Sequence, residues 1–356
     1  MLVHICCSVD SHYFMTELRK LYPKEKITGF FYNPNIHPLS EHELRYIDVK
    51  RSCDKLGIDL IKGEYDYEQW FALAKKYADE PEKGLRCELC FDIRMNKSVE
   101  LAKKLDKKAF TSTLLMSPKK DIEQLTKSIK KECEDSGINF LIPDFRKGGG
   151  TQKQFEMAKK EKLYHQNYCG CFFALNKQNL NKIVTNEFSS PLNKQILPSS
   201  VEDRIQTYKK VAKLEKEKKD YEIIREKFLN YRLLNALISC DKEVIKSHVL
   251  FYSHFKNKTT RININDNYDK FFASKDEILL LSFNAFNKIC KNKFKNFNDL
   301  LNNPLSIKNE TKVRNVFFEP YNLSPIIILE HIPKGKIQIQ AKSEIYFDVR
   351  DKLIKL

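Results

Sequence analysis

The chain opens with Met1-Leu2-Val3-His4-Ile5-Cys6-Cys7-Ser8-Val9-Asp10, a short apolar stretch that stops at two adjacent cysteines. A short apolar run of this kind is typical of a buried β-strand. Four more such runs follow, and the segments between them place apolar residues at helical spacing. These runs cover residues 27–32, 58–61, 109–115 and 138–142. The alternation predicts a doubly wound α/β domain with a mostly parallel sheet.

Polar residues end two of the predicted strands. Cys6 and Cys7 end the first strand, and the segment Ser112 to Ser117 ends the fourth. In a doubly wound sheet, ligands bind in a crevice outside the carboxyl ends of the strands. We therefore expect a ligand site at this edge of the sheet, next to the first cysteine pair.

Six of the ten cysteines stand in three close pairs, which are Cys6 with Cys7, Cys87 with Cys90, and Cys169 with Cys171. Thiolates in this number suit Zn²⁺ or an iron–sulfur cluster. Ligands of structural zinc are normally two to four residues apart, whereas adjacent side chains diverge and more easily reach separate corners of a bulky cluster. The spacing favours an iron–sulfur site at Cys6, Cys7, Cys87 and Cys90, with structural zinc or no metal as the alternatives.

The third cysteine pair has a different character. Only Gly170 separates Cys169 from Cys171, so the two thiols can close a small strained disulfide of the labile, catalytic kind. Two buried thiols, or two more metal ligands, are the alternatives. Asp10 lies three residues after Cys7, where a carboxylate can ligate iron, donate a proton or cap a helix. The isolated residues Cys53, Cys133, Cys240 and Cys290 are expected to be small buried side chains.

The net charge of +16 is unevenly distributed along the chain. Residues 1–175 contain 30 basic and 26 acidic side chains, whereas residues 176–356 contain 33 and 21, a net charge of +12. A basic half indicates a polyanionic partner, nucleic acid first, because clustered Lys and Arg release counterions from phosphates. A Lys-rich composition without functional meaning is the alternative. No run of about 18 apolar residues exists, so we expect no membrane span and a cytoplasmic protein.

The second half of the chain carries a different pattern. Residues 176–200 resemble a linker, residues 203–235 a long helix, and residues 325–347 a hairpin that turns at Lys334-Gly335. We therefore expect two domains: an α/β domain over residues 1–178 and a basic α+β domain over residues 179–356.

Five motifs of the first half occur together in one known family. They are His4-Ile5-Cys6-Cys7, Tyr32-Asn33-Pro34-Asn35-Ile36-His37-Pro38, Arg86-Cys87-Glu88-Leu89-Cys90-Phe91, Thr113-Leu114-Leu115-Met116-Ser117-Pro118-Lys119 and Tyr168-Cys169-Gly170-Cys171. Together they resemble the QueH family of epoxyqueuosine reductases over residues 1–175. The resemblance implies a HUP-like α/β domain with a [4Fe-4S] cluster and no cobalamin. It implies reduction of the epoxide of epoxyqueuosine at the wobble position of certain tRNAs, the last step of queuosine formation.

The resemblance also implies roles for the site residues. Cys6, Cys7, Cys87 and Cys90 match the cluster cysteines of the family, and Cys169 and Cys171 match its redox-active disulfide. The sequence departs from the family pattern at Ser8-Val9-Asp10, where many relatives have Ala-Pro-Cys. In the members that share this aspartate it joins the iron site. Asp10 can therefore replace Cys6 or Cys7 as a cluster ligand, which would leave those two cysteines to hold a separate iron.

A second class of function stays open at this point, namely a zinc-stabilised tRNA-binding protein or a nucleotide-dependent tRNA-modifying protein. The first strand argues against nucleotide dependence, because Cys6-Cys7 stand where a Gly-rich phosphate loop would follow. The oligomeric state and the electron donor that the reductase would need are not identified by any motif.

Overall fold

The computed structural model describes residues 1–134, 136–166, 168–177, 195–291 and 293–356. The chain divides into two compact units. The first consists of Met1–Ile183, Arg204–Ile223 and Leu353–Leu356, and the second of Val184–Asp203 and Ile224–Lys352. The first unit therefore includes residues 204–223 and 353–356, which we assigned above to a second domain.

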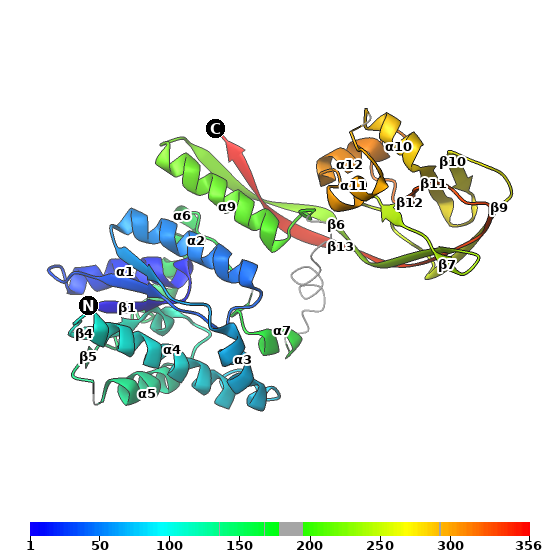
Figure 1. Cartoon of the computed structure of the whole chain (residues 1–356). Coiled ribbons are helices and arrows are strands. Elements are labelled where there is room, and N and C mark those ends of the chain that lie inside the picture. The colour runs from blue at the N-terminus through cyan, green and yellow to red at the C-terminus, as the bar shows by residue number, and fades with distance from the viewer. Residues whose placement is uncertain (135, 167, 178–194, 292) are drawn as a thin grey trace. The chain divides into compact units, whose positions relative to one another are not determined.

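The first unit is built on a five-stranded sheet in the order β3-β2-β1-β4-β5 (Figure 1). Each pair of neighbouring strands is parallel, so the prediction of a doubly wound α/β fold is confirmed. The strands are β1 (Leu2–Ile5), β2 (Thr28–Phe31), β3 (Asp59–Lys62), β4 (Ala109–Ser112) and β5 (Asn139–Phe140). Residues 113–115, predicted to continue the fourth strand, form a 3₁₀ turn over Thr113–Met116 instead.

Helices cover both faces of this sheet, with α1 and α2 on one face and α4 and α5 on the other (Figure 1). The helices are α1 (Ser8–Leu21), α2 (Leu39–Leu56), α3 (Tyr67–Ala74), α4 (Leu85–Lys104), α5 (Ile122–Cys133), α6 (Gly150–Lys160), α7 (Phe172–Lys177) and α9 (Val201–Lys216), with a 3₁₀ turn at Lys75–Tyr77. The strands are buried between the two helical layers, and all four residues of β1 are fully or nearly fully enclosed. No helix among the described residues has the length and apolar character needed to span a bilayer.

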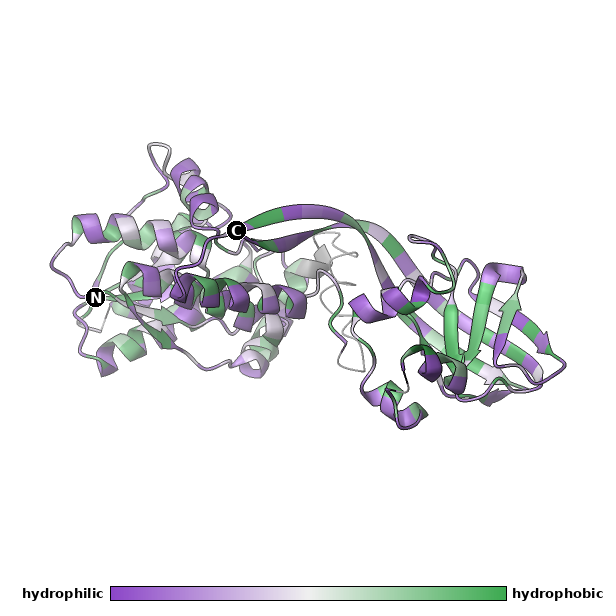
Figure 2. Cartoon of the chain, turned by 90° about the horizontal axis from the view of Figure 1, so that it is seen from above, coloured by the Kyte–Doolittle hydropathy of each residue, from purple (hydrophilic) through white to green (hydrophobic). Residues whose placement is uncertain are grey.

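The second unit contains two four-stranded sheets, in the orders β10-β11-β12-β8 and β7-β6-β13-β9. The apolar central strands of the first of these are fully buried and stand out in Figure 2. Three short helices accompany them, so the expected α+β class is confirmed. The elements are β6 (Tyr221–Cys240), β7 (Glu243–Val244), β8 (Ser247–Val249), β9 (Thr259–Ile264), β10 (Lys270–Ala273), β11 (Ile278–Ser282), α10 (Phe283–Ile289), α11 (Phe297–Asn302), α12 (Ile307–Arg314), β12 (Ile326–Leu329) and β13 (Gly335–Lys355), with a 3₁₀ turn at Lys275–Glu277.

Two predictions for this half were wrong. The helix predicted over residues 203–235 ends at Lys216, and Lys218 with φ +53° reverses the chain into β6. Residues 221–240 are rich in β-branched and aromatic side chains, which favour a strand once a partner strand is available. The hairpin predicted over residues 325–347 does not form, because β12 pairs with β11 and β8 while β13 pairs with β9.

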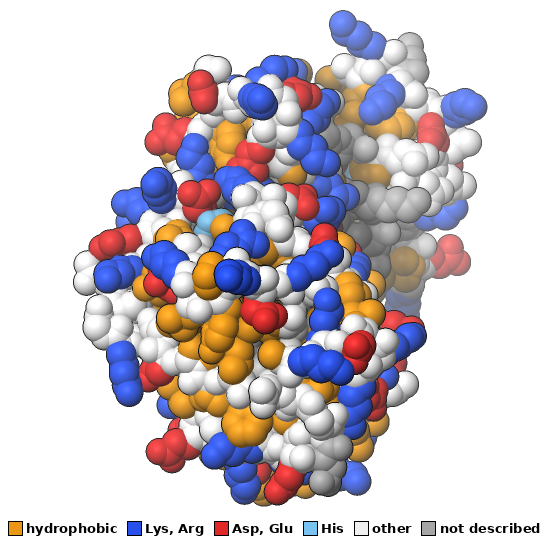
Figure 3. Space-filling view, turned by 90° about the vertical axis from the view of Figure 1, so that its left-hand side faces the viewer, with side chains coloured by type: hydrophobic (Ala, Val, Ile, Leu, Met, Phe, Trp, Pro, Cys, Tyr) orange, Lys and Arg blue, Asp and Glu red, His pale blue; other side chains and the backbone are white. Residues whose placement is uncertain are grey.

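Basic side chains do not gather into one area on the face that Figure 3 shows. Lys and Arg are interspersed there with Asp and Glu. Elsewhere in the described chain, some basic side chains pair with acidic neighbours in sequence, as Lys213 does with Glu217 and Lys50 with Asp54. The net positive charge of the chain therefore does not mark a nucleic-acid contact surface on this face.

Candidate active site

The two central strands of the first unit end at one crevice. β1 and β4 are neighbours in the sheet, with β2 on the far side of β1 and β5 on the far side of β4. The chain leaves β1 towards β2 and leaves β4 towards β5, so the loops after β1 and β4 run in opposite directions and diverge. A crevice at such a switch point is the usual ligand site of this architecture. Here it contains a cavity of about 140 Å³. Its wall includes Cys6, Asp10, Asn35, Arg45, Arg94, Lys119, Lys120, Phe155, His165, Tyr168 and Cys169.

The buried residue His4 fixes the strands that carry this crevice. Its Nδ1 lies 3.0 Å from Ser112 Oγ on β4, and its Nε2 lies 3.0 Å from the backbone oxygen of Tyr32. Burial lowers the pKa of His4 well below its ordinary value, so the ring is neutral and one nitrogen must accept. His4 is thus a packed histidine with a structural role.

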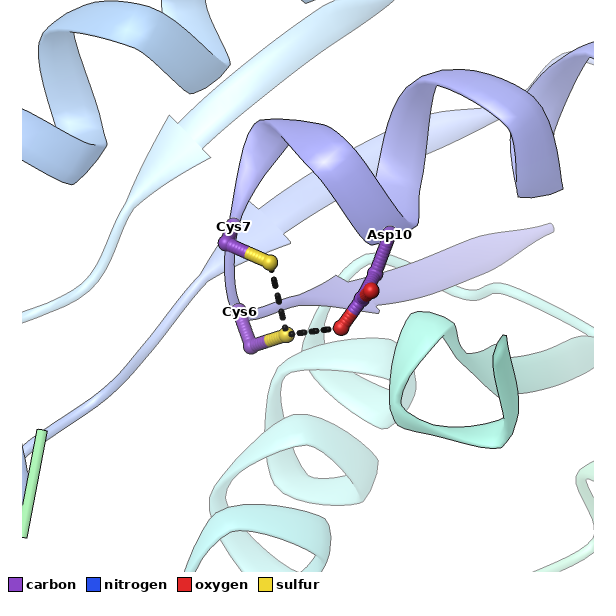
Figure 4. A group of neighbouring side chains, drawn as sticks. All are labelled: Cys6, Cys7 and Asp10. Carbon is purple, nitrogen blue, oxygen red and sulfur yellow. Dashed lines mark hydrogen bonds between the residues drawn. The ribbon is translucent and has the colours of Figure 1, made fainter. Parts of the chain in front are cut away.

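Cys6, Cys7 and Asp10 form a compact group at the start of α1 (Figure 4). Their ligand atoms all lie within 4.8 Å of one another. Cys6 Sγ lies 3.6 Å from Cys7 Sγ and 3.6 Å from Asp10 Oδ2. The strand ends at Ile5 and the helix begins at Ser8, so the two cysteines occupy the sharp turn between them, and Asp10 points back from the first helical turn.

The electrostatics of this group fit a bound cation. The hydrogen bond with Cys6, followed by burial and the charge of Asp10, raises the pKa of Cys7 well above its ordinary value. Burial raises the pKa of Asp10 as well. Burial thus disfavours the ionised forms of Cys7 and Asp10, whereas a metal ion stabilises thiolate and carboxylate together. Two sulfurs and one oxygen suit iron or zinc.

Two residues that the sequence analysis missed hold this group in place. Gln154 of α6 is fully buried and donates from Nε2 to Asp10 Oδ1 at 2.6 Å. Asp48 of α2 accepts from Ser8 Oγ and also accepts from the backbone N–H of Tyr164 at 2.7 Å. Both lie inside helices without a recognisable motif, so only their long-range contacts reveal them.

The second cysteine pair lies at the beginning of α4. Cys87 and Cys90 are three residues apart in this helix, so both side chains project from the same side. Cys87 lines a smaller cavity of about 30 Å³ together with Cys169, Cys171 and Lys120. Burial raises the pKa of Cys87 above its ordinary value. Among the described residues, the compact ligand group contains Cys6, Cys7 and Asp10 but not Cys87 and Cys90.

Lys120 connects the two cavities, since it lines both of them. Burial lowers the pKa of Lys120, but the neighbouring thiols Cys169, Cys87 and Cys90 outweigh burial and raise it. Lys120 is therefore a fixed positive charge among the cysteines. Its place directly after the Ser117-Pro118-Lys119 segment, at the end of the fourth strand, is a signal that could have identified it from the sequence.

Cys169 and Cys171 are free thiols that differ in ionisation. The hydrogen bond from Cys171, assisted by Lys120 and opposed by burial, holds the pKa of Cys169 well below its ordinary value. The same hydrogen bond and burial raise the pKa of Cys171. Cys169 is half-buried and lines both cavities, whereas Cys171 is buried. A low-pKa thiolate beside a protonated thiol is the arrangement of a reactive dithiol.

Arg45 of α2 holds the backbone of this dithiol segment. Its guanidinium donates to the carbonyl oxygens of Tyr168 at 2.9 Å and Cys169 at 3.2 Å. It also pairs with Glu41 at 2.8 Å, and both side chains are buried. His37 donates its backbone N–H to Gly170 O at 2.9 Å from the opposite side. The segment between the two thiols is thus restrained on both flanks.

Comparison with known proteins identifies the family. The family model described as epoxyqueuosine reductase QueH matches residues 1–177. The epoxyqueuosine reductase QueH of Helicobacter pylori (strain ATCC 700392 / 26695) is 35% identical over 361 residues, which cover 96% of this chain and 97% of that protein. The chain belongs to the QueH family of epoxyqueuosine reductases. This membership confirms the resemblance drawn from the motifs, and it does not favour the zinc-stabilised or nucleotide-dependent alternative.

Other QueH proteins match about half of the chain. QueH of Histophilus somni (strain 129Pt) is 38% identical over 180 residues, covering 50% of this chain and 73% of that protein. QueH of Thermotoga maritima is 35% identical over 178 residues, covering 49% of this chain and 90% of that protein. A solved structure, the U34-tRNA thiolase NcsA from Methanococcus maripaludis with its [4Fe-4S] cluster, aligns over 60% of this chain and 73% of that chain with a TM-score of 0.33 and 14% identity.

Proposed function

We propose that this QueH chain reduces the epoxide of epoxyqueuosine in tRNA to the alkene of queuosine. The observation that carries the proposal is the meeting of Cys6, Asp10 and Cys169 on one cavity at the switch point of the sheet. Removing the epoxide oxygen as water requires two electrons and two protons. Two thiols that close to a disulfide release both, so one epoxide and one dithiol become one alkene, one water and one disulfide. Cys169 and Cys171 are the dithiol we assign to this balance.

The charge around the cavity suits a nucleotide. Arg45, Arg94, Lys119 and Lys120 line it with positive charge, and Phe155 and Tyr168 add aromatic faces. A base inserted here has to leave its stack, and stacking on aromatic side chains stabilises an unstacked base. The substrate is then positioned beside Cys169, whose pKa the Cys171 hydrogen bond keeps low.

We further propose that Cys6, Cys7, Cys87 and Cys90 hold the [4Fe-4S] cluster, with Asp10 as an alternative ligand or as a ligand to a separate iron together with Cys6 and Cys7. The compact group of Cys6, Cys7 and Asp10 supports the first part of this assignment. For Cys87 and Cys90 the support is the charge that both share with Lys120, which lines the same cavity as Cys6. Such a cluster, when bound, supplies electrons to the chemistry. If Asp10 is not a metal ligand, its raised pKa suits it to donate a proton to the epoxide oxygen. The electron donor that restores the dithiol stays unassigned.

Metal analysis of anaerobically purified protein tests this assignment. We expect Cys87→Ser and Cys90→Ser each to lose iron and acid-labile sulfide, because a hydroxyl is a poor substitute for a thiolate ligand. Cys133→Ser is the matched control, since Cys133 is buried elsewhere in the same unit and should leave the metal content unchanged. If either α4 variant keeps its full iron and sulfide content, the substituted cysteine is not a ligand. If the unsubstituted protein contains zinc in place of iron, the proposed cluster is wrong.

A further inference from the structure

The second unit contains a cavity of its own, of about 490 Å³, between β6, β13 and the segment after α12. Its size lies in the range of sites for small organic ligands, which measure roughly 300–1,000 Å³. Aromatic, cationic and amide side chains share its wall. They are Lys227, Phe228, Tyr252, Arg314, Asn315, Tyr321, Asn322 and Arg350, beside the single carboxylate Glu226.

Two tyrosines of this wall are held in an unusual backbone conformation. Tyr252 has φ +67° and Tyr321 has φ +72°, in the left-handed region that bulky residues seldom adopt. Tyr252 is fixed further by the hydrogen bond from its hydroxyl to Leu229 O at 3.0 Å. Tyr321 is 94% exposed, so its ring lies open to a ligand at the edge of the cavity.

Among the charged side chains of the cavity wall, cations outnumber the single carboxylate, so the wall carries a net positive charge. The Arg350 guanidinium lies 4.8 Å from the centre of the Phe228 ring and pairs with Glu226 at 2.6 Å. Glu226 also binds Lys352 at 2.9 Å, so two cations share that one carboxylate. Arg314 is buried, with its donors used on backbone oxygens such as Ser324 O at 2.7 Å and on Ser253 Oγ at 2.8 Å.

QueH proteins differ in how much of this chain they match, and this difference bears on the role of the second unit. The H. somni and T. maritima enzymes match only about half of this chain, whereas the H. pylori enzyme matches 96% of it. All three are named epoxyqueuosine reductase. The match to the T. maritima protein covers 90% of that protein but only 49% of this chain, so a protein of this name lacks a counterpart to much of this chain. We therefore look to substrate binding, rather than chemistry, for the role of the second unit. Aromatic faces interleaved with Arg and Lys are the pattern of proteins that hold unpaired nucleotides.

We propose that this cavity holds an unpaired nucleotide of the substrate tRNA outside the active site. The base stacks on Tyr321, and the phosphate lies against the positive charge of Arg350 and Lys227. This inference rests on the proposed function, because it takes the tRNA substrate as given. It adds a second point of attachment, which anchors the tRNA body while the first unit holds the modified base.

Affinity measurements on the full chain test this role. We expect Tyr321→Ala to weaken binding of epoxyqueuosine-containing tRNA by about tenfold, since stacking on one aromatic ring is commonly worth this factor. Tyr321→Phe should bind as the unsubstituted protein does, because the stacking face remains. Tyr268→Ala is the matched control, as Tyr268 is an exposed tyrosine of the same unit that does not line the cavity. Because Tyr321 is almost fully exposed, its loss should leave the melting temperature unchanged.

The same preparations separate failure of this inference from failure of the proposed function. If the unsubstituted protein converts no epoxyqueuosine with a chemical reductant, the proposed function fails. If it does convert epoxyqueuosine but Tyr321→Ala binds tRNA as tightly as the Tyr268→Ala control, the cavity does not hold RNA. A single-stranded RNA hexanucleotide should compete with tRNA for the unsubstituted protein, and an RNA duplex of equal length should compete less. Equal competition by both would also reject an unpaired nucleotide as the ligand.

Discussion

Cys169 and Cys171 show how two identical side chains acquire different roles two residues apart. The hydrogen bond between them lowers the pKa of Cys169 and raises that of Cys171, while Lys120 adds to the effect on Cys169. The thiolate rather than the thiol is the nucleophile. Cys169 is therefore the sulfur that we expect to react first, and Cys171 the one that closes the disulfide.

Substitution separates this role from metal binding. We expect Cys169→Ser and Cys171→Ser each to abolish turnover while keeping iron and sulfide at the level of the unsubstituted protein, because we propose that the pair stores electrons and does not ligate the metal. Activity and metal content measured on one anaerobic preparation check this. Loss of the cluster absorbance in either variant would instead make that cysteine a ligand.

Asn35 lines the cavity with a side-chain oxygen that has no hydrogen-bond partner among the described residues. The residue is 4% exposed, and the oxygen is Oδ1. An unsatisfied buried acceptor costs about 1–3 kcal/mol, so this oxygen is poised for a donor on the substrate.

We expect Asn35→Leu to raise KM for the tRNA substrate by about tenfold or more, while the melting temperature stays unchanged or increases. A lost hydrogen bond to the ligand explains the first effect, and removal of an unsatisfied oxygen explains the second. Steady-state kinetics and thermal unfolding provide the two readouts. An unchanged KM would show that the substrate does not use this oxygen.

At the scale of elements, the loop that carries the dithiol is restrained by close packing against the segment after β2. Gly170 has φ +99°, and a Cβ placed there would lie 2.8 Å from Ile36 Cγ1 and 3.1 Å from Ile36 Cα. A glycine is thus required for two reasons, the backbone conformation and the space. Arg45 and His37 then hold the flanking peptide groups.

We expect Gly170→Ala to destabilise the fold by about 1–3 kcal/mol and to lower turnover, because the strain displaces the two thiols. Gly137→Ala is a suitable control, since Gly137 has φ +69° but a Cβ added there would meet no atom within 4 Å. The control measures the conformational strain alone. Denaturant unfolding and single-turnover reduction would test the difference, and equal effects of the two substitutions would show that contact with Ile36 does not matter.

At the scale of the whole molecule, the strands β6 and β13 form the frame on which the second unit is built. Leu356 N–H donates to Asp220 O at 3.3 Å and Asp241 N–H donates to Lys336 O at 3.2 Å, so the two strands are antiparallel. Arg350 lies opposite Glu226 in this register. A tight Asn-Gly turn can close such a pair of strands.

We therefore expect a chain in which Asn-Gly replaces residues 228–348 to keep the first unit folded and the cluster bound. It should bind tRNA more weakly, with a shallower dependence of affinity on salt, by roughly 0.7–0.9 in slope for each lost phosphate contact. Dissociation constants at several salt concentrations, together with iron content, check this. If affinity depends on salt with the same slope in the shortened and full chains, the second unit does not contact tRNA phosphates.

Much of the first unit was determined by the sequence alone. Short apolar runs such as Val3 to Ile5 and the pairs Cys6-Cys7 and Cys169-Gly170-Cys171 are local signals, because burial and strand ends leave their pattern within a few residues. The doubly wound fold then predicts a crevice at the point where the loops after β1 and β4 diverge. The five motifs of the first half likewise identify the family without any tertiary information.

Only the tertiary structure decided the rest. Gln154 and Arg45 reach Asp10 and the dithiol segment from helices more than 100 residues away in sequence, and no local pattern records such a contact. Residues 221–235 are compatible with a helix or a strand, and pairing with β13 selects the strand. In the same way, β12 and β13 carry hairpin-like patterns, but their partners belong to different sheets. Strand pairing depends on which edges meet during assembly, a non-local property that the sequence of one segment does not contain.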